Sequence, residues 1–250
     1  MRKATIILIF LNSILIYGQT ILNSEKILSE IDSSMVFVTS LDGDFSKGNI
    51  NLVNATFSSQ IGKKIDNKKL IRFIYNYTYT SENKEILSDD SSGQIRFNYL
   101  IDDDSYFLFF QAQNVKSLNI NKRILFGGGY RKRLIGNLQN YTDISLGIFK
   151  ENEDYNIESD KLKIRNLRYS FSIFSKYKLS EKISLNNTLY YQLNTKNKKD
   201  FRIFIEPRLS FSFEKLNFFI TTRNRFHSTP YLIDLKYNDN NTSFGFEYIL

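Results

Sequence analysis

Catalysis by a serine nucleophile is the first chemistry to consider, because the single histidine, His227, is followed directly by Ser228. A serine hydrolase needs an imidazole within hydrogen-bond reach of the hydroxyl and a third group that orients the imidazole. The chain contains no Gly-x-Ser-x-Gly sequence. Ser81 and Lys84 match Ser-x-x-Lys, but the companion motifs of that pattern are missing. We therefore interpret His227 as a solvated loop residue and keep a surface lipid hydrolase as an alternative function.

Two further patterns are incomplete as phosphate or metal sites. Residues 127–129 are consecutive glycines without the Gly-Lys-Ser/Thr ending of a phosphate loop, so we expect them to permit a bend or close packing in a strand. Acidic side chains crowd residues 151–160 without the glycine that a calcium loop requires at its sixth position, so we expect a solvated loop. These acids are Glu151, Glu153, Asp154, Glu158 and Asp160. We expect no catalytic residue, no metal and no cofactor.

Charged residues also recur at alternate positions in segments whose other positions are apolar. Alternate side chains of a strand point to opposite faces, so these charges would share one face, and we expect them to form a network inside a barrel. The expected members are Arg72, Arg96, Arg123, Arg131, Asp143, Glu151, Glu153, Arg168, Arg202, Glu206, Arg208 and Arg223. By this phase rule, arginines outnumber acids roughly two to one. The lumen is then either plugged by arginine–carboxylate pairs or open as a positively charged pore.

The segments that carry these charges alternate in the manner of β-strands. Six alternate clearly and six less regularly, which predicts about twelve strands, most of them near the 9–11 residues of a tilted membrane strand. The clear segments are residues 69–80, 92–101, 164–179, 183–193, 201–213 and 216–226. The less regular segments are residues 35–45, 49–62, 106–114, 121–134, 140–151 and 242–250.

Short and long connections alternate along the chain, as they do in up-and-down outer-membrane barrels with short periplasmic turns and longer outer loops. The short ones are residues 102–105, 180–182 and 214–215, and the longer polar ones are residues 81–91, 152–163, 194–200 and 227–241. We place residues 231–237 in the last outer loop, which keeps the strand number even. Pro207 has no N–H to donate, so we expect a bulge or irregular pairing near residues 206–208.

The aromatic residues decide which face of the strands points outward. A soluble barrel turns its apolar phase inward, and a membrane barrel turns it outward. The apolar phase is rich in Phe and Tyr, of which the chain has 22 and 16, too many for one lumen. An arginine facing lipid at the bilayer midplane would cost about 2–4 kcal/mol. We therefore expect an all-β, up-and-down antiparallel transmembrane β-barrel preceded by a short N-terminal helix.

The N-terminus has the order of a secretory signal peptide. Arg2 and Lys3 precede an apolar run that ends at Tyr17, and the small residue Gly18 follows. Cleavage between Gly18 and Gln19 would remove two positive charges and change the formal net charge from +8 to 8 − 2 = +6. We expect a signal peptide over residues 1–18, a short helical periplasmic segment over residues 19–34 and the outer-membrane barrel over residues 35–250.

The last residues have the spacing polar–x–Gly–x–x–aromatic–x–apolar. They are Ser243, Gly245, Tyr248 and Leu250. This spacing resembles the signal that outer-membrane barrels present to their insertion machinery, although Leu250 stands where Phe is more usual. We expect outer-membrane lipid and that machinery as partners. Basic residues are scattered without a run, which argues against a nucleic-acid partner, and the absence of cysteine excludes disulfides.

Four stretches, residues 43–62, 110–133, 147–155 and 225–230, carry a family resemblance. In their order along the chain they resemble the salt-induced outer-membrane proteins, domain-of-unknown-function family 481. The resemblance implies a barrel in the Gram-negative outer membrane and no known activity. We therefore expect a non-enzymatic protein with a structural or envelope-stress role. A narrow anion-favouring pore is the first alternative, and no small-molecule ligand is identified.

Overall fold

The computed structural model describes residues 35–250, except for residues 48–50, 138, 157–160 and 233–234. The expected signal peptide and short N-terminal helix fall on residues 1–34, outside the described residues. Among the described residues, no helix is long and apolar enough to cross a membrane.

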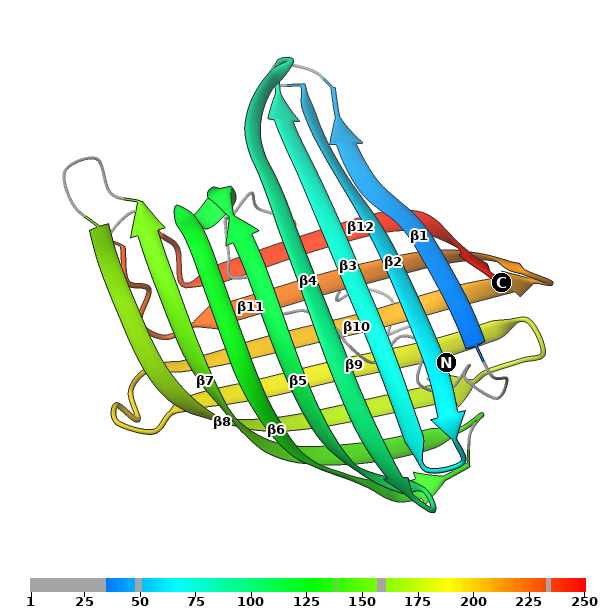
Figure 1. Cartoon of the computed structure of the whole chain (residues 1–250). Coiled ribbons are helices and arrows are strands. Elements are labelled where there is room, and N and C mark those ends of the chain that lie inside the picture. The colour runs from blue at the N-terminus through cyan, green and yellow to red at the C-terminus, as the bar shows by residue number, and fades with distance from the viewer. Residues whose placement is uncertain (1–34, 48–50, 138, 157–160, 233–234) are drawn as a thin grey trace, which may run out of the picture.

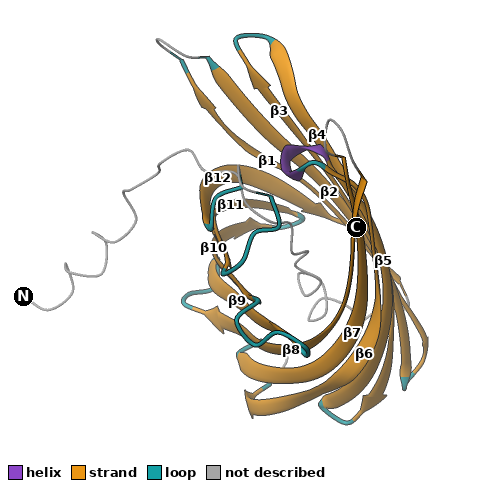
Figure 2. Cartoon of the chain, turned by 90° about the vertical axis from the view of Figure 1, so that its left-hand side faces the viewer, coloured by secondary structure: helices purple, strands orange, loops and turns teal. Residues whose placement is uncertain are grey.

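Twelve antiparallel strands form a closed barrel in which each strand pairs with its neighbours in sequence and β1 pairs with β12 (Figures 1 and 2). The strands are β1 (Met35–Ser46), β2 (Leu52–Asp66), β3 (Lys69–Glu82), β4 (Glu85–Ile101), β5 (Asp104–Val115), β6 (Ile120–Gly136), β7 (Tyr141–Asn156), β8 (Lys161–Lys178), β9 (Ile183–Asn194), β10 (Phe201–Phe213), β11 (Leu216–His227) and β12 (Asn238–Ile249). A short 3-10 helix, η3 (Lys116–Leu118), lies between β5 and β6. The expected all-β barrel and its strand number are confirmed.

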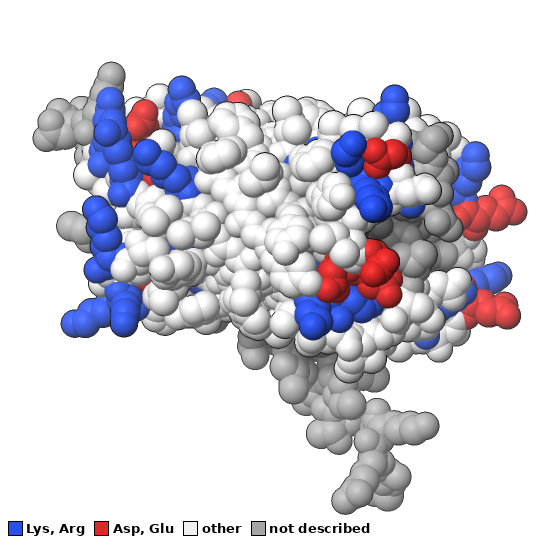
Figure 3. Space-filling view, turned by 60° about the horizontal axis from the view of Figure 1, so that its bottom comes forward, with Lys and Arg blue, Asp and Glu red and all other residues white. Residues whose placement is uncertain are grey.

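The barrel is apolar outside and polar inside. Large side chains such as Phe126, Leu146 and Tyr169 point outward and are 60%, 61% and 56% exposed, whereas Arg168 and Arg202 point inward and are 0% exposed. Figure 3 shows a band without charged side chains between two charged ends of this face. An exposed apolar surface of this extent marks an interaction with lipid or with another protein. The apolar side chains of the strands therefore face outward and the charged ones face inward, as expected for a membrane barrel.

The first residue of β1 and the last residue of β12 lie at the same end of the barrel, the one that carries short turns. Residues 67–68, 102–103 and 214–215 connect strands there, and β1 begins and β12 ends there. Leu250 closes the ring by accepting a hydrogen bond from the N–H of Phe37 at 3.1 Å and donating one to its carbonyl at 2.9 Å. The opposite end carries η3 and the connections at residues 195–200 and 228–237 (Figure 2). The described residues among 231–237 thus lie in the last connection at this opposite end, as expected.

The prediction of a long polar loop at residues 81–91 is wrong. β3 and β4 continue to Glu82 and from Glu85, so a two-residue turn connects them. Asn83 and Lys84 have positive φ of 49° and 74° in this turn, a conformation that asparagine tolerates well. The polar residues that looked like a loop instead extend the hairpin beyond the apolar band, because solvated strands need no apolar phase.

Pro207 interrupts one ladder without shifting its register. β10 pairs with β11 at Ile205↔Asn224 and again at Arg208↔Thr221, with no pairs between them. The ladder between β10 and β9 continues through Pro207. The predicted irregular pairing is therefore present as a gap instead of a bulge, because the missing N–H would have faced β11.

Candidate functional site in the barrel lumen

Buried carboxylates at the loop-bearing end of the lumen are surrounded by arginines from three other strands. Glu151 Oε1 accepts hydrogen bonds from Arg123 Nε at 2.9 Å and Arg202 Nη1 at 2.6 Å, and its Oε2 accepts one from Arg168 Nε at 2.8 Å. Glu153 lies 3.0 Å from Arg123 Nε and 3.3 Å from Arg202 Nη2. Charges buried this deeply are stable only when paired and hydrogen-bonded, and this cluster meets that condition.

Asp200 extends the cluster to the end of the barrel. This residue lies in the connection before β10, outside the strands, and its Oδ2 accepts hydrogen bonds from Arg168 Nη2 at 2.8 Å and Tyr231 Oη at 2.7 Å. Its Oδ1 lies 2.8 Å from His227 Nε2. Burial alone would raise the pKa of Asp200, but hydrogen bonds from His227 and Asn194 and the charge of Arg168 together hold it well below the usual value. Asp200 is therefore a carboxylate at neutral pH.

A second cluster joins the first and last strands to β10 and β11. Arg223 Nη1 donates to Asp42 Oδ2 at 2.8 Å, and Arg223 Nε donates to Glu206 Oε2 at 3.0 Å. Ser243 Oγ also donates to Asp42 Oδ2, at 2.8 Å. Because Asp42 on β1 reaches Arg223 on β11 across β12, this cluster depends on the pairing of β1 with β12 that closes the barrel.

Other inward-facing arginines contact aromatic rings as well as carboxylates. Arg131 Nε donates to Asp143 Oδ2 at 2.8 Å, and its guanidinium carbon lies 4.8 Å from the Phe174 ring centre. The guanidinium carbon of Arg96 lies 4.0 Å from the Phe107 ring centre. Such cation–π contacts contribute most where both partners are desolvated. The aromatic rings that project inward therefore help to accommodate the arginines.

The lumen is charge-balanced, contrary to the excess of arginine expected from the sequence. The described residues include eight buried arginines and eight buried carboxylates. The arginines are Arg72, Arg96, Arg123, Arg131, Arg168, Arg202, Arg208 and Arg223, and the carboxylates are Asp42, Asp143, Glu151, Glu153, Asp200, Glu206, Asp239 and Glu247. The structure thus buries all twelve residues named for the network and adds four acids. Those four lie on the irregular β1 and β12 or in a connection, where alternation does not reveal them.

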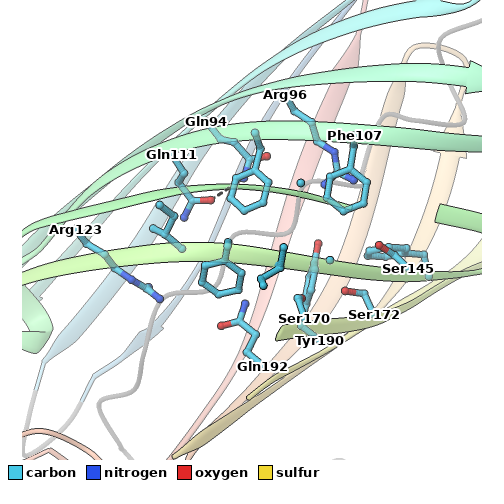
Figure 4. Close-up of a pocket in the computed structure, with 17 residues that line it drawn as sticks. Gln94, Arg96, Phe107, Gln111, Arg123, Ser145, Ser170, Ser172, Tyr190 and Gln192 are labelled. Carbon is cyan, nitrogen blue, oxygen red and sulfur yellow. Dashed lines mark hydrogen bonds between the residues drawn. The ribbon is translucent and has the colours of Figure 1, made fainter. Parts of the chain in front are cut away.

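A small cavity lined by both polar and aromatic side chains lies beside the Arg123 cluster (Figure 4). Its volume is about 60 Å³, and its lining includes Gln94, Arg96, Gln111 and Gln192. Gln94 Nε2 donates to Gln111 Oε1 at 2.6 Å across two neighbouring strands. A cavity needs about 10–15 Å³ of such volume to hold one water molecule, so this cavity has room for a few waters.

The last long connection folds into the mouth of the barrel. Tyr231, Leu232 and Leu235 pack against a buried apolar cluster at this end. That cluster consists of Val115, Leu118, Ile120 and Tyr155. The Tyr231 hydroxyl also accepts a hydrogen bond from Arg168 Nη2 at 2.8 Å. The loop thereby covers the Glu151 cluster and connects it to apolar packing.

His227 is not the solvated loop residue expected from the sequence. It ends β11 and is 2% exposed, because β11 extends to this residue and its side chain faces Asp200. Ser228 Oγ instead accepts a hydrogen bond from the Phe201 N–H at 2.8 Å and donates to the Lys199 carbonyl. No hydrogen bond joins Ser228 to His227 among the described residues. Likewise Glu151 and Glu153 are buried in strand β7, not in a solvated loop.

The residues of the proposed insertion signal lie on both faces of β12. Ser243 is buried and contacts Asp42 and Arg223 by hydrogen bonds. Gly245 lies inside, where an added Cβ would stand 2.6 Å from the Phe219 ring. Tyr248 and Leu250 are exposed. The alternation of small or polar residues with apolar residues in this motif therefore reflects the inward and outward faces of β12.

Comparison with known proteins identifies similar barrels and one family model. The structure resembles the COG4313 outer membrane channel from Pseudomonas putida F1 (TM-score 0.52, 10% identity, 93% of this chain and 97% of that chain). It also resembles the NanC porin (TM-score 0.51, 10% identity, 85% and 98% of the two chains). At these identities the likeness concerns the fold. No curated protein matches the sequence. The family model described as "Protein of unknown function, DUF481" matches residues 43–249.

Proposed function

This chain belongs to the DUF481 family of proteins of unknown function, and on that premise we propose that it is a non-enzymatic outer-membrane β-barrel with a filled lumen. Its role is then structural, or related to envelope stress, and not the passage of solutes. The observation that carries this proposal is the balanced set of eight arginines and eight carboxylates buried among the described residues.

The equal number of buried arginines and carboxylates matters because a pore for anions needs unpaired positive charge along a water-filled path. In this barrel Arg123, Arg168 and Arg202 are all engaged by the carboxylates of one short stretch of β7. The inward-folded connection containing Tyr231 lies over them. Solute passage would require separation of buried ion pairs, which is costly when one partner is left without the other.

The outward apolar face supports placement in a membrane. Side chains such as Phe126 and Leu146 would otherwise be exposed to water, and each large side chain gains about 1.5–3 kcal/mol when it is removed from water. The signal peptide expected over residues 1–18 and the C-terminal pattern expected for the insertion machinery favour the outer membrane. On this placement, the short turns lie in the periplasm and the connection at residues 228–237 lies outside.

A surface lipid hydrolase is the enzymatic alternative, and the geometry of Ser228 opposes it. Its hydroxyl is engaged by the backbone of Lys199 and Phe201, and the nearby imidazole of His227 is directed to Asp200. We infer that the protein has no hydrolytic activity of its own. If a purified sample hydrolysed lipid esters, His227→Ala should leave that activity unchanged, and its loss would revive the alternative.

Cell fractionation followed by electrophoresis with and without boiling tests the placement. We expect the protein in the outer-membrane fraction, with a folded form that migrates differently from the boiled form. A soluble periplasmic protein that shows no shift on boiling would overturn the membrane barrel. A narrow anion-favouring pore is the remaining alternative, and ion conductance distinguishes it from the filled barrel.

A further inference from the structure

A cationic groove lies on the outer wall of the barrel, near the end that carries the long connections. Its volume is about 230 Å³, and its charged lining consists of Lys122, Lys150, Asp154, Lys163 and Arg165. All four cations are exposed and point away from the lumen. The groove is thus separate from the buried charge network.

The pairing of β6, β7 and β8 explains why these side chains are gathered. Lys122 and Lys163 are the cross-strand partners of Asp154 on its two sides. One step further from the rim, Arg165 is the partner of Asn152. Neighbouring strands lie about 4.8 Å apart, so the backbones at Lys122 and Lys163 are roughly 10 Å apart on either side of Asp154. Lys150 lies four residues further from the rim on β7, about 13 Å along the strand.

The charge of the groove is positive and is not neutralised internally. Its lining has four cations and one carboxylate, which gives 4 − 1 = +3. Within the described part of the chain, no ion pair joins these four cations to a carboxylate. Lysine and arginine placed this way are typical binding groups for phosphate.

Among the outward strand positions near this rim, cations are concentrated on β6, β7 and β8, whereas the connections at the same end carry further exposed lysines, Lys84, Lys196, Lys198 and Lys199. Outward positions near the same end of other strands carry neutral side chains, for example Val53 on β2, Tyr79 on β3 and Phe226 on β11. Asp89 on β4 forms an ion pair with Lys116. In Figure 3 the left end, which carries the long connections, shows many Lys and Arg side chains, and the right end shows Lys and Arg together with Asp and Glu.

The groove lies directly above the apolar band. Lys150 pairs with Phe126 on one side and with Leu167 on the other, and these two side chains are 60% and 41% exposed. A lipid whose chains contact the band would therefore place its headgroup at the level of the cations. On the proposed outer-membrane placement, this level is the headgroup region of the outer leaflet.

We propose that this groove binds the phosphate groups of the phosphorylated glycolipid that forms the outer leaflet. Lys122, Lys163 and Arg165 contact phosphate, while the acyl chains lie along Phe126 and Leu167. The inference rests on the proposed function for its orientation, because the same cations at a periplasmic rim would face a different lipid.

Binding of purified lipid A to the folded, detergent-solubilised full-length protein tests the proposal. The variant K122Q/K150Q/K163Q/R165Q should bind bisphosphorylated lipid A at least about tenfold more weakly than the natural protein. The matched control K63Q/K132Q/K178Q/K215Q removes four exposed lysines at the opposite end and should bind as the natural protein does. Dephosphorylated lipid A should bind weakly to all three proteins.

Equal binding by the groove variant and the natural protein would overturn the proposal, and so would an equal loss in the control. Competition by millimolar inorganic phosphate would show a site for free phosphate instead of lipid. Migration before and after boiling checks that each variant is folded, and K122Q/K163Q replaces the fourfold variant if that one does not fold. Because binding is measured in detergent, its failure is distinguishable from a failure of the outer-membrane placement, which fractionation reports.

Discussion

At the scale of single residues, the lumen is organised by arginines that share carboxylates. Glu151 accepts hydrogen bonds from Arg123, Arg168 and Arg202, so one acid partly compensates three positive charges. Removing one partner of a buried pair is costly, because the remaining charge is left without compensation. This makes Glu151 the residue whose charge the cluster needs most.

We predict that Glu151→Gln lowers the free energy of unfolding by about 3–5 kcal/mol. The substitution keeps the shape of the side chain and removes the charge that holds the three arginines together. Urea unfolding followed by circular dichroism in detergent measures the change. Glu181→Gln, at an exposed position in the 179–182 turn, is the matched control and should change stability by less than about 0.5 kcal/mol. An equal effect of the two substitutions would contradict this account of the cluster.

The lowered pKa of Asp200 predicts a loss of stability in acid. A carboxyl group with a depressed folded-state pKa contributes stability that is present above its unfolded pKa, near 3.8. That contribution disappears as pH falls through the lower folded-state pKa, because the unfolded chain binds the proton first. The urea midpoint should therefore decrease below about pH 4, and Asp200→Asn should show a smaller decrease. Identical pH profiles for the two proteins would show that Asp200 does not contribute.

The arginines of the lumen could be predicted from the sequence, but half of their acidic partners could not. Arg72 and Arg202 stand in clear alternating segments, whereas Asp200 lies in a connection and reaches Arg168 only because the loop folds back. Asp42 meets Arg223 across 181 residues of sequence. Such a contact depends on closure between β1 and β12, which local alternation does not describe.

At the scale of elements, the glycines of β6 and β7 let the aromatic rings of the lumen pack against the wall. A Cβ added to Gly129 would stand 2.7 Å from Phe107 Cζ and 2.7 Å from the Gly147 Cα. The close packing against lumen side chains expected for residues 127–129 is therefore confirmed at Gly127 and Gly129, whereas Gly128 meets the outward-facing Leu108. Strands of more than about nine residues could be predicted because their alternation is long enough to recognise. The hairpin at residues 81–91 could not, because its polar residues occupy both phases.

We predict that Gly129→Ala destabilises the barrel by about 1–3 kcal/mol, since the new methyl group must displace both a ring and a backbone. Gly93→Ala is the matched control, because an added Cβ there meets nothing within 4 Å. Thermal unfolding of the two variants, followed by the loss of the folded band in electrophoresis, makes the comparison. If Gly129→Ala were as stable as Gly93→Ala, the lumen would be less tightly packed than the structure indicates.

At the scale of the whole molecule, the barrel has two separate polar systems. The inner system is balanced and buried, and the outer one is the cationic groove on β6, β7 and β8. The inner system accounts for the filled lumen, and the outer system concerns the surrounding lipid. A negative mean hydropathy of −0.33 is compatible with a membrane barrel because it averages the polar lumen with the apolar wall.

Single-channel recording in planar bilayers tests the central claim, a filled lumen, most directly. Purified protein that shows the folded band should be reconstituted and held at a series of voltages in symmetric and asymmetric KCl. We predict that it gives no steady channel events, because paired charges and the connection containing Tyr231 occupy the lumen. A steady ohmic conductance that favours anions would contradict the filled barrel and establish the pore.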